Sequence, residues 1–281
     1  MELRQPIICG LIVRKENDMD TLGDRMKEYE NVNRHYLTAR LPIILRLDGK
    51  SFHTYTKCFK KPYDKCFLEA MQQTAKSLCQ KIEGCKFAYT QSDEISLLLV
   101  NYENINTEGW FGNNIQKMVS VAASMASISF YKHLTKIVDN YAATKIGEYP
   151  YIDKMLDTLN NKEAVFDCRC FILPKEEVVN YFWWRQLDCR RNSVNAVAQH
   201  YFAPWELLHK NSDEKKRMLQ EHMEISWEDD YPTYFRNGTV LFKQQFHFKN
   251  EENKDVVRNW WIIDQRPPLF VEDRNYIEQY I

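Results

Sequence analysis

The spacing of apolar residues between positions 42 and 100 predicts a strand, a helix and two further strands. Residues 42–47 (PIILRL) form an apolar run of strand length, and residues 64–82 place apolar side chains at helical spacing. Two more short apolar runs, 86–89 and 95–100, are separated by a tight polar turn, which indicates paired strands.

The next apolar segments complete a known order of elements. Residues 110–134 have the length and pattern of a long helix rich in small residues, and residues 165–173 supply a fourth strand. The order β-α-β-β-α-β is that of the split βαβ, or ferredoxin-like, arrangement, which polymerase palms and nucleotide cyclases share. We therefore expect an α+β fold built on a ferredoxin-like palm.

Beyond Pro174 the pattern changes to helices followed by a hairpin. The expected helices cover 175–188, a continuation over 192–201, and 212–221, and the expected hairpin strands cover 239–248 and 256–263. This pattern predicts three parts of the chain. They are an N-terminal extension over residues 1–18, a palm-type domain over 19–174, and a helical extension over 175–281 whose C-terminal hairpin packs on the palm. A helical start is expected near Met19.

Composition constrains the partners and the compartment. The 281 residues are 44% hydrophobic, enough for a buried core, and carry a formal net charge of −1, so RNA would have to be bound by a local basic patch. The eight cysteines include no C-x-x-C pair, which favours a reducing, cytoplasmic location over a zinc ribbon or a secreted disulfide framework. The apolar stretch 7–13 is too short to cross a bilayer, so no membrane partner is expected.

Two carboxylates are predicted to meet at one edge of the sheet. In the split βαβ topology the first two strands are parallel, so the end of the first strand and the turn after the second lie at the same edge. Asp48 follows the first strand, and Asp93 lies in that turn. With the carbonyl oxygen of Gly49 they form a hard oxygen site suited to Mg²⁺. Two such ions promote in-line displacement at phosphorus.

Each of these residues taken alone has an ordinary structural explanation. Asp-Gly after a strand is commonly a turn, and Ser92 and Glu94 commonly cap or charge a hairpin. The seven histidines show no H-E-x-x-H or paired zinc spacing, so none is assigned as a metal ligand. The position of Asp48 and Asp93 at matched strand ends is what favours a metal site.

Several motifs resemble the successive signatures of the tRNA-histidine guanylyltransferase superfamily. They are segments 46–53 (RLDGKSFH), 59–64 (FKKPYD) and 89–96 (YTQSDEIS), followed by later runs at 166–169 and 181–188. The likeness extends over most of residues 20–270. The resemblance implies that Asp48, Asp93 and the Gly49 carbonyl ligate two Mg²⁺ ions, that tRNA is the partner, that nucleoside triphosphates (GTP and ATP) are substrates, and that the protein is a homotetramer.

The resemblance also implies contacts to the nucleotide. Lys61 and Lys117 would contact the triphosphate, and His53 and Ser92 would lie near the nucleotide. Without the family, both lysines are equally well explained as solvated surface residues, and His53 is more often a structural residue.

One local difference separates the branches of the family. The members dedicated to tRNA-histidine, which add a single G, carry His-Ile-Asn-Asn-Leu-Tyr-Asn where this chain has residues 190–196, and only Asn192 agrees. This difference argues against the dedicated role. The chain is more similar to the guanylyltransferase-like branch, which extends 5′-truncated tRNAs by template-dependent pairing.

Basic and aromatic residues of the predicted helical extension are candidates for RNA contacts. Arg185, Arg190 and Arg191 would bind RNA phosphates. The neighbouring Trp183 and Trp184 are expected to be packing residues, because aromatic side chains at helical spacing usually face a core.

Three classes of function remain open. The favoured one is a 3′-to-5′ polymerase that repairs the 5′ ends of tRNAs. The second is a dedicated guanylyltransferase or a palm-fold nucleotide cyclase, which would share the metal carboxylates. The third is a non-catalytic RNA-binding protein with a vestigial site, and the joint presence of Asp48, Asp93, Lys61 and Lys117 argues against it.

Overall fold

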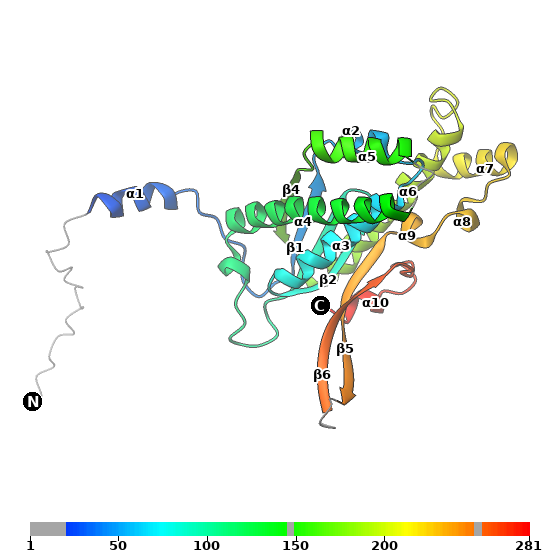
Figure 1. Ribbon diagram of the computed structural model, residues 1–281. Helices are drawn as coiled ribbons and strands as arrows, with labels where there is room; N and C mark the ends of the chain where they lie inside the picture. Colours follow the sequence, from blue (N-terminus) through cyan, green and yellow to red (C-terminus); the bar gives the residue numbers. More distant parts are fainter. Residues whose placement is uncertain (1–20, 145–148, 250–254) are drawn as a thin grey trace, which may run out of the picture. The chain divides into compact units, whose positions relative to one another are not determined.

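A single antiparallel sheet organises the part of the chain that the computed structural model describes, which comprises residues 21–144, 149–249 and 255–281 (Figure 1). Its six strands are β1 (Ile43–Gly49), β2 (Cys85–Gln91), β3 (Glu94–Leu99), β4 (Phe166–Ile172), β5 (Thr239–Lys249) and β6 (Asp255–Asp264), in the order β4-β1-β3-β2-β5-β6. Because β1 and β2 are both antiparallel to β3, which lies between them, they are parallel to each other. The predicted α+β class and the predicted direction of these strands are confirmed.

The longer helices largely follow the expected order, and several short helical elements were not predicted. The helical elements are α1 (Leu22–Asn31), α2 (Phe52–Tyr55), η1 (Thr56–Cys58), α3 (Lys65–Lys81), η2 (Trp110–Asn113), α4 (Ile115–Thr144), α5 (Tyr149–Asn161), α6 (Lys175–Tyr201), α7 (Ser212–Met223), α8 (Trp227–Asp230), α9 (Thr233–Arg236) and α10 (Asn275–Glu278). Helix α5 was not predicted. Helix α6 runs without a break through positions where two segments were expected, because its buried residues continue from Val178 to Ala198.

The sheet separates two hydrophobic clusters. On one face, alternate residues of β1 such as Leu45 and Leu47 pack with α3 and α4, which lie side by side (Figure 1). On the other face, Ile44 packs with Phe182 of α6 and with residues of α10. Side chains of successive strand residues point to opposite faces, so Arg46 and Asp48 share the α6 face with Ile44.

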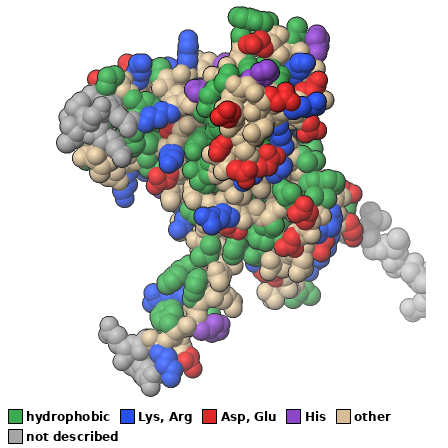
Figure 2. All heavy atoms as spheres, turned by 90° about the vertical axis from the view of Figure 1, so that its right-hand side faces the viewer, with side chains coloured by type: hydrophobic (Ala, Val, Ile, Leu, Met, Phe, Trp, Pro, Cys, Tyr) green, Lys and Arg blue, Asp and Glu red, His purple; other side chains and the backbone are tan. Residues whose placement is uncertain are grey.

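Residues after β4 are joined to the sheet in two ways. The second half of α6 packs with α7 and α8 around the buried Trp227. Strand β5 pairs with β2 from Thr239 to Phe242, so the predicted hairpin extends the sheet. The distal part of the hairpin carries exposed hydrophobic and basic side chains (Figure 2). Trp260 is one of the exposed hydrophobic residues there. Residues 36–281 form one compact unit, and the division of roles at Pro174 stays a prediction.

The N-terminal unit, residues 1–35, contains helix α1. Thr21 caps this helix, since its hydroxyl accepts a hydrogen bond from the backbone N–H of Asp24. The helical start expected in this region is thereby confirmed, whereas the extension predicted over residues 1–18 lies outside the described residues. In the described ranges, no helix combines the length and the apolar character that crossing a membrane requires.

Candidate active site

Asp48 and Asp93 meet at one edge of the sheet, as predicted. Asp48 is near the end of β1, in register with Glu94 at the start of β3. The backbone N–H of Gly49 donates a hydrogen bond to the carbonyl oxygen of Asp93 over 3.1 Å. This bond ties the end of the first strand to the turn between β2 and β3, so both carboxylates belong to one small region.

Local packing and backbone conformation support this arrangement. A Cβ atom on Gly49 would lie 2.4 Å from the ring of Phe52, and that ring is buried among Phe67, Phe130 and Phe166. Only glycine therefore fits where β1 passes over Phe52. In the β2–β3 turn, Ser92 has a positive φ of 48°, a conformation that non-glycine residues adopt rarely and at a cost in free energy.

The electrostatics of the site favour a bound cation. Burial raises the pKa of the Asp93 carboxyl and the charge of Asp48 adds to the shift, while the backbone, Ser92 and His53 lower this pKa. Among the described residues, no lysine or arginine forms an ion pair with Asp48 or Asp93. In the described part of the chain, the negative charges of Asp48 and Asp93 are therefore not neutralised by an ion pair with a lysine or arginine.

This donor set fits Mg²⁺. The described residues contain no group of three or more His, Cys, Asp and Glu side chains suited to a metal. Magnesium needs no such cage, because it keeps several waters and is commonly bound by one or two carboxylates together with substrate phosphates. Asp48, Asp93 and the carbonyl oxygen of Gly49 would supply hard oxygen ligands of this kind.

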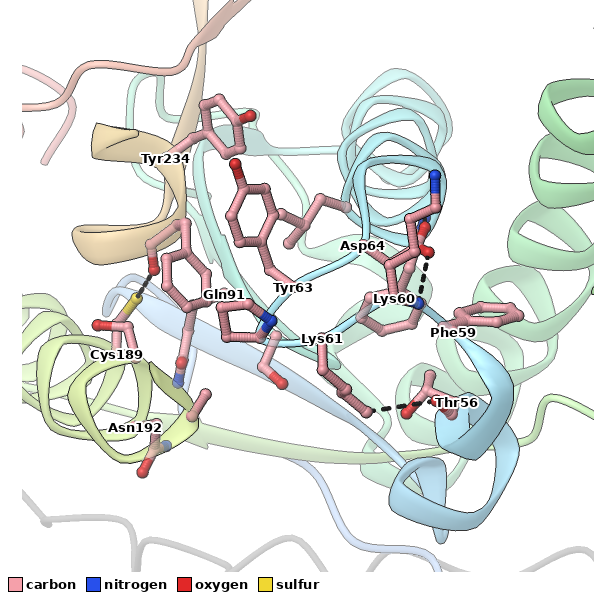
Figure 3. Close-up of a pocket in the computed structure, with 17 residues that line it drawn as sticks. Thr56, Phe59, Lys60, Lys61, Tyr63, Asp64, Gln91, Cys189, Asn192 and Tyr234 are labelled. Atoms are coloured by element: carbon pink, nitrogen blue, oxygen red, sulfur yellow. Dashed lines mark hydrogen bonds between the residues drawn. The ribbon is translucent and has the colours of Figure 1, made fainter. Parts of the chain in front are cut away.

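Two adjoining hollows lie beside the carboxylates. The first, a surface hollow, is lined by Gly49, Ser51, Phe52, His53, Thr56, Phe67, Ser92 and Asp93. The second, a cavity of about 150 Å³, shares Thr56, Phe67 and Ser92 with the first. It reaches from the loop before α3 to the surface of α6 (Figure 3). Of the predicted nucleotide residues, Ser92 lines both hollows and His53 lines the first.

Lys61 lines the second of these hollows. Its Nζ donates a hydrogen bond to the carbonyl oxygen of Thr56 over 3.3 Å, and the side chain is exposed (Figure 3). An exposed ammonium group at the wall of a cavity can rotate toward an anion bound there. Lys61 therefore lies at the wall of a cavity that adjoins the hollow lined by Asp93, and its contact with the triphosphate stays a prediction.

Lys117 lies elsewhere in the chain. Its backbone N–H donates to Asn114 at the start of α4, and its Nζ lies 6.0 Å from the centre of the Phe111 ring. The adjoining Asn113 contacts Leu37 and Asn101, near the beginning of β1, whereas Asp48 is near its end. Since a strand rises about 3.3 Å per residue, these two ends are roughly 20 Å apart. A single chain does not bring Lys117 to Asp48 and Asp93.

The three predicted RNA-binding arginines differ in exposure. The Arg185 side chain is only 4% exposed and pairs with Glu94 and Asp188, so it does not present its charge to the surface. Arg190 is half-buried, where it donates to Asn237 over 2.5 Å and lies over the ring of Trp227. The Arg191 side chain is 65% exposed and pairs with Asp188. Arg191 is therefore the exposed candidate of the three.

The expectation for the two tryptophans is half correct. Trp183 is half-buried against the cluster under α6, as predicted. The packing predicted for Trp184 is wrong, because this residue is 52% exposed and its ring covers the guanidinium group of Arg185 at 4.2 Å. The exposed ring thus shields a buried cation instead of filling a core.

Sequence reasoning missed several residues of the site. The cavity wall includes Tyr63 and Phe235, which stack with ring centroids 4.7 Å apart, and Asn192 of α6. Tyr63 lies within the motif 59–64 and Asn192 within the segment that separates the branches, but nothing in the sequence shows that they and Phe235 line one cavity, because they come from three distant segments. A signal did exist for the pair of Arg46 and Glu94, since each is a charged residue in an otherwise apolar strand and such charges are usually paired.

Known proteins resemble this chain over nearly its whole length. The family model described as "Thg1: tRNAHis guanylyltransferase" matches residues 23–174. The structure of a bacterial tRNA(His) guanylyltransferase (Thg1)-like protein in complex with ATP superposes with a TM-score of 0.77 and 38% identity, covering 93% of this chain and 99% of that one.

Relatives of eukaryotes and a virus show the same likeness. The tRNA(His) guanylyltransferase of Debaryomyces hansenii is 26% identical over 261 residues, 88% of this chain and 90% of that protein. An uncharacterised protein of Acanthamoeba polyphaga mimivirus is 29% identical over 251 residues, 86% of this chain and 83% of that protein. Together with the fold, these matches define the chain as a nucleotidyltransferase. It belongs to the Thg1 family of tRNAHis guanylyltransferases.

Proposed function

We propose that this protein adds nucleotides in the 3′-to-5′ direction to the 5′ ends of truncated tRNAs, directed by the opposing strand. The observation that carries the proposal is the junction of Asp48 and Asp93, closed by the hydrogen bond from Gly49 and adjoined by the cavity that Lys61 lines. In this reaction the 3′-hydroxyl of an incoming nucleotide attacks an activated 5′-phosphate of the RNA, and the activating group leaves.

The residues of the site have separate tasks in this reaction. Asp48, Asp93 and the carbonyl of Gly49 would hold two Mg²⁺ ions, which supply activation of the attacking hydroxyl and neutralisation of the leaving group when bound. Lys61 would bind triphosphate oxygens as a point charge. Ser92 and His53, at the wall of the first hollow, would orient the reacting phosphate.

Nucleotide binding is supported by the relatives. Structures of the bacterial Thg1-like protein are described in complex with ATP and, at the same 38% identity, in complex with GTP. We infer that this chain also takes ATP and GTP, with the stacked rings of Tyr63 and Phe235 forming an apolar wall of the cavity for a base.

The repair branch is supported by two observations. The dedicated signature is absent from residues 190–196. The bacterial Thg1-like protein is 38% identical, whereas the tRNA(His) guanylyltransferase of Debaryomyces hansenii is 26% identical. Both point to template-dependent addition on many tRNAs.

The proposal includes the organisation of the molecule. The strand order β4-β1-β3-β2 is that of a split βαβ palm, which supports a catalytic palm over residues 19–174 and an RNA-binding extension over 175–281. A homotetramer is inferred from the family. The cytoplasmic location is inferred from the sequence, whose eight cysteines include no C-x-x-C pair.

The test is incubation of the purified protein with tRNAs lacking one 5′ nucleotide, all four nucleoside triphosphates and Mg²⁺, followed by sizing and sequencing of the products. We expect each tRNA to regain the nucleotide complementary to the opposing base, and a changed opposing base to change the added nucleotide. Addition of G alone, only to tRNA-histidine and regardless of the opposing base, would assign the chain to the dedicated branch. No RNA product at all would contradict the proposal.

A further inference from the structure

Helix α6 holds the β2–β3 turn through buried charges. The turn consists of Gln91, Ser92, Asp93 and Glu94, and its two outer residues both contact side chains of α6. Its inner residues carry the candidate metal ligand Asp93 and the strained Ser92. The contacts to α6 therefore hold the turn on both sides of Ser92 and Asp93.

Arg185 is the centre of these contacts. Its Nε lies 2.9 Å from a carboxylate oxygen of Glu94, and its Nη2 lies 2.5 Å from Oδ2 of Asp188. Arg185 and Glu94 are only 4% and 5% exposed at their side chains, so this is a desolvated pair. Nη2 donates a hydrogen bond to Asp188, whereas Nε forms no directed hydrogen bond in the described part of the chain, so the contact with Glu94 is between charges.

The remaining flank of the turn closes a ring of contacts. The side-chain amide of Gln91 lies 3.5 Å from Oδ2 of Asp188, the same oxygen that Arg185 approaches. The chain of contacts therefore runs from Gln91 through Asp188 and Arg185 to Glu94. Arg46 of β1 adds a second cation, with its Nε 3.2 Å from Glu94. Since Arg46 precedes Asp48 by two residues on the same strand face, Glu94 links α6 to the strand that carries the other carboxylate.

The strained turn explains why such a ring has a function. A non-glycine residue at positive φ persists only where the surroundings over-determine its conformation, and Ser92 is such a residue. The contacts from α6, which come from outside the turn, offset the cost of this conformation.

We propose that Arg185, together with Asp188, is a positioning residue that holds the β2–β3 turn so that Asp93 stays beside Asp48 in a geometry competent for a divalent cation. This inference rests on the proposed function, because it takes Asp93 as a metal ligand. It gives Arg185 a task different from the predicted RNA contact.

The test measures metal binding directly, with Mn²⁺ as the probe and electron paramagnetic resonance of the free ion as the readout. The full-length protein is compared with the double variant Arg185→Met/Glu94→Gln, which removes both members of the most deeply buried pair and leaves Arg46, whose side chain is 19% exposed, without its carboxylate partner. A second variant, Asp188→Asn, breaks the ring at a residue whose side chain is 18% exposed. If the double variant shows no cooperative unfolding transition, and is therefore not folded, the Asp188→Asn variant alone tests the positioning role.

Two further variants serve as references. Gln186→Met changes a buried polar neighbour on the same helix that contacts Pro268 and Phe270 instead of the turn. Asp93→Asn removes the candidate ligand itself. We expect Mn²⁺ affinity to fall at least tenfold in the double variant and in Asp188→Asn, to be unchanged in Gln186→Met, and to be lost in Asp93→Asn.

The possible outcomes distinguish a failure of the positioning role from a failure of the metal site. Wild-type Mn²⁺ affinity in the folded ring variants, with loss in Asp93→Asn, would overturn the positioning role and leave the metal site intact. Wild-type affinity in Asp93→Asn would overturn the metal site of the proposed function. An equal loss in Gln186→Met would show that any damage to α6 weakens the site, which would also overturn the specific role of Arg185.

Discussion

Asp93 lies half-buried beside Asp48, so that burial first and the charge of Asp48 second raise the pKa of the Asp93 carboxyl. The hydrogen bond from the backbone of Gly49 keeps this unfavourable pair together. An arrangement that the fold maintains at a cost in stability is typical of a functional site, and a divalent cation would offset that cost.

Removal of either carboxylate should abolish nucleotide transfer. We expect Asp48→Ala and Asp93→Ala each to lower the turnover number by about 100-fold or more, the scale on which loss of one electrostatic group slows an enzyme. Circular dichroism should show an intact fold, because neither side chain belongs to a hydrophobic cluster. Asp139→Ala, at an exposed position of α4, is the matched control. Near wild-type turnover in either variant with Mg²⁺ would contradict the two-metal assignment.

The substitution Asp93→Asn should stabilise the metal-free protein at neutral pH. Since the pKa of Asp93 is higher in the folded chain than in the unfolded chain, its ionised form lowers the free energy of unfolding above the folded-state pKa. The variant lacks this cost, and its unfolding midpoint should rise by about 2–4 °C for each kcal/mol gained.

The pH dependence of that gain provides the check. The difference between variant and wild type should shrink as the pH falls through the folded-state pKa and vanish below the unfolded value of about 3.9, where the carboxyl is protonated in both states. Mg²⁺ should raise the midpoint of the wild type only. A difference in midpoint that stays constant between pH 3 and pH 8 would show that the charge of Asp93 is not its cause.

Lys61→Ala should impair the use of nucleoside triphosphate. A hydrogen bond to a charged group contributes about 1.5–3 kcal/mol, so the apparent KM for the nucleotide should rise roughly 10- to 150-fold with little change in tRNA affinity. Steady-state kinetics at varied nucleotide concentration measure this effect.

Lys117→Ala is the informative companion of that variant. Family likeness predicts the same defect, whereas the fold places Lys117 near the other end of β1. A normal nucleotide KM would show that Lys117 is a solvated surface residue. An equal defect would require a site completed by a second copy of the chain, which mixing of Lys61→Ala with Lys117→Ala subunits would then restore in part.

Arg191→Gln should weaken binding to all tRNAs alike. The Arg191 side chain is exposed and carries no base-specific geometry in this fold, so it fits a phosphate contact. The slope of log affinity against log salt concentration should become less steep by about one unit. Arg190→Gln should also lower thermal stability, because Arg190 lies over Trp227 and bonds to Asn237. Altered preference among tRNA sequences in Arg191→Gln would argue for base recognition instead.

The sequence by itself determined the frame of this protein. Short apolar runs at residues 42–47 and 95–100 predicted β1 and β3, because strand length and side-chain alternation depend only on neighbours in the chain. The order of elements then made β1 parallel to β2, which brought Asp48 and Asp93 to one edge. The family motifs then implied the metal ligands and the nucleotide contacts, and these predictions did not require the tertiary structure.

Only the tertiary structure decided which charged side chains are buried and which are exposed to solvent. Arg185 and Arg191 are both arginines of α6, yet Arg185 is desolvated against Glu94, which lies far from it in sequence, and Arg191 faces solvent. Helical spacing could not separate them, because the partner that compensates a buried charge comes from another element and the cost of desolvation depends on everything packed around it. For the same reason, only the tertiary structure shows that Trp183 is half-buried whereas Trp184 is exposed. It also shows that Lys61 lines the cavity whereas Lys117 lies near the other end of β1.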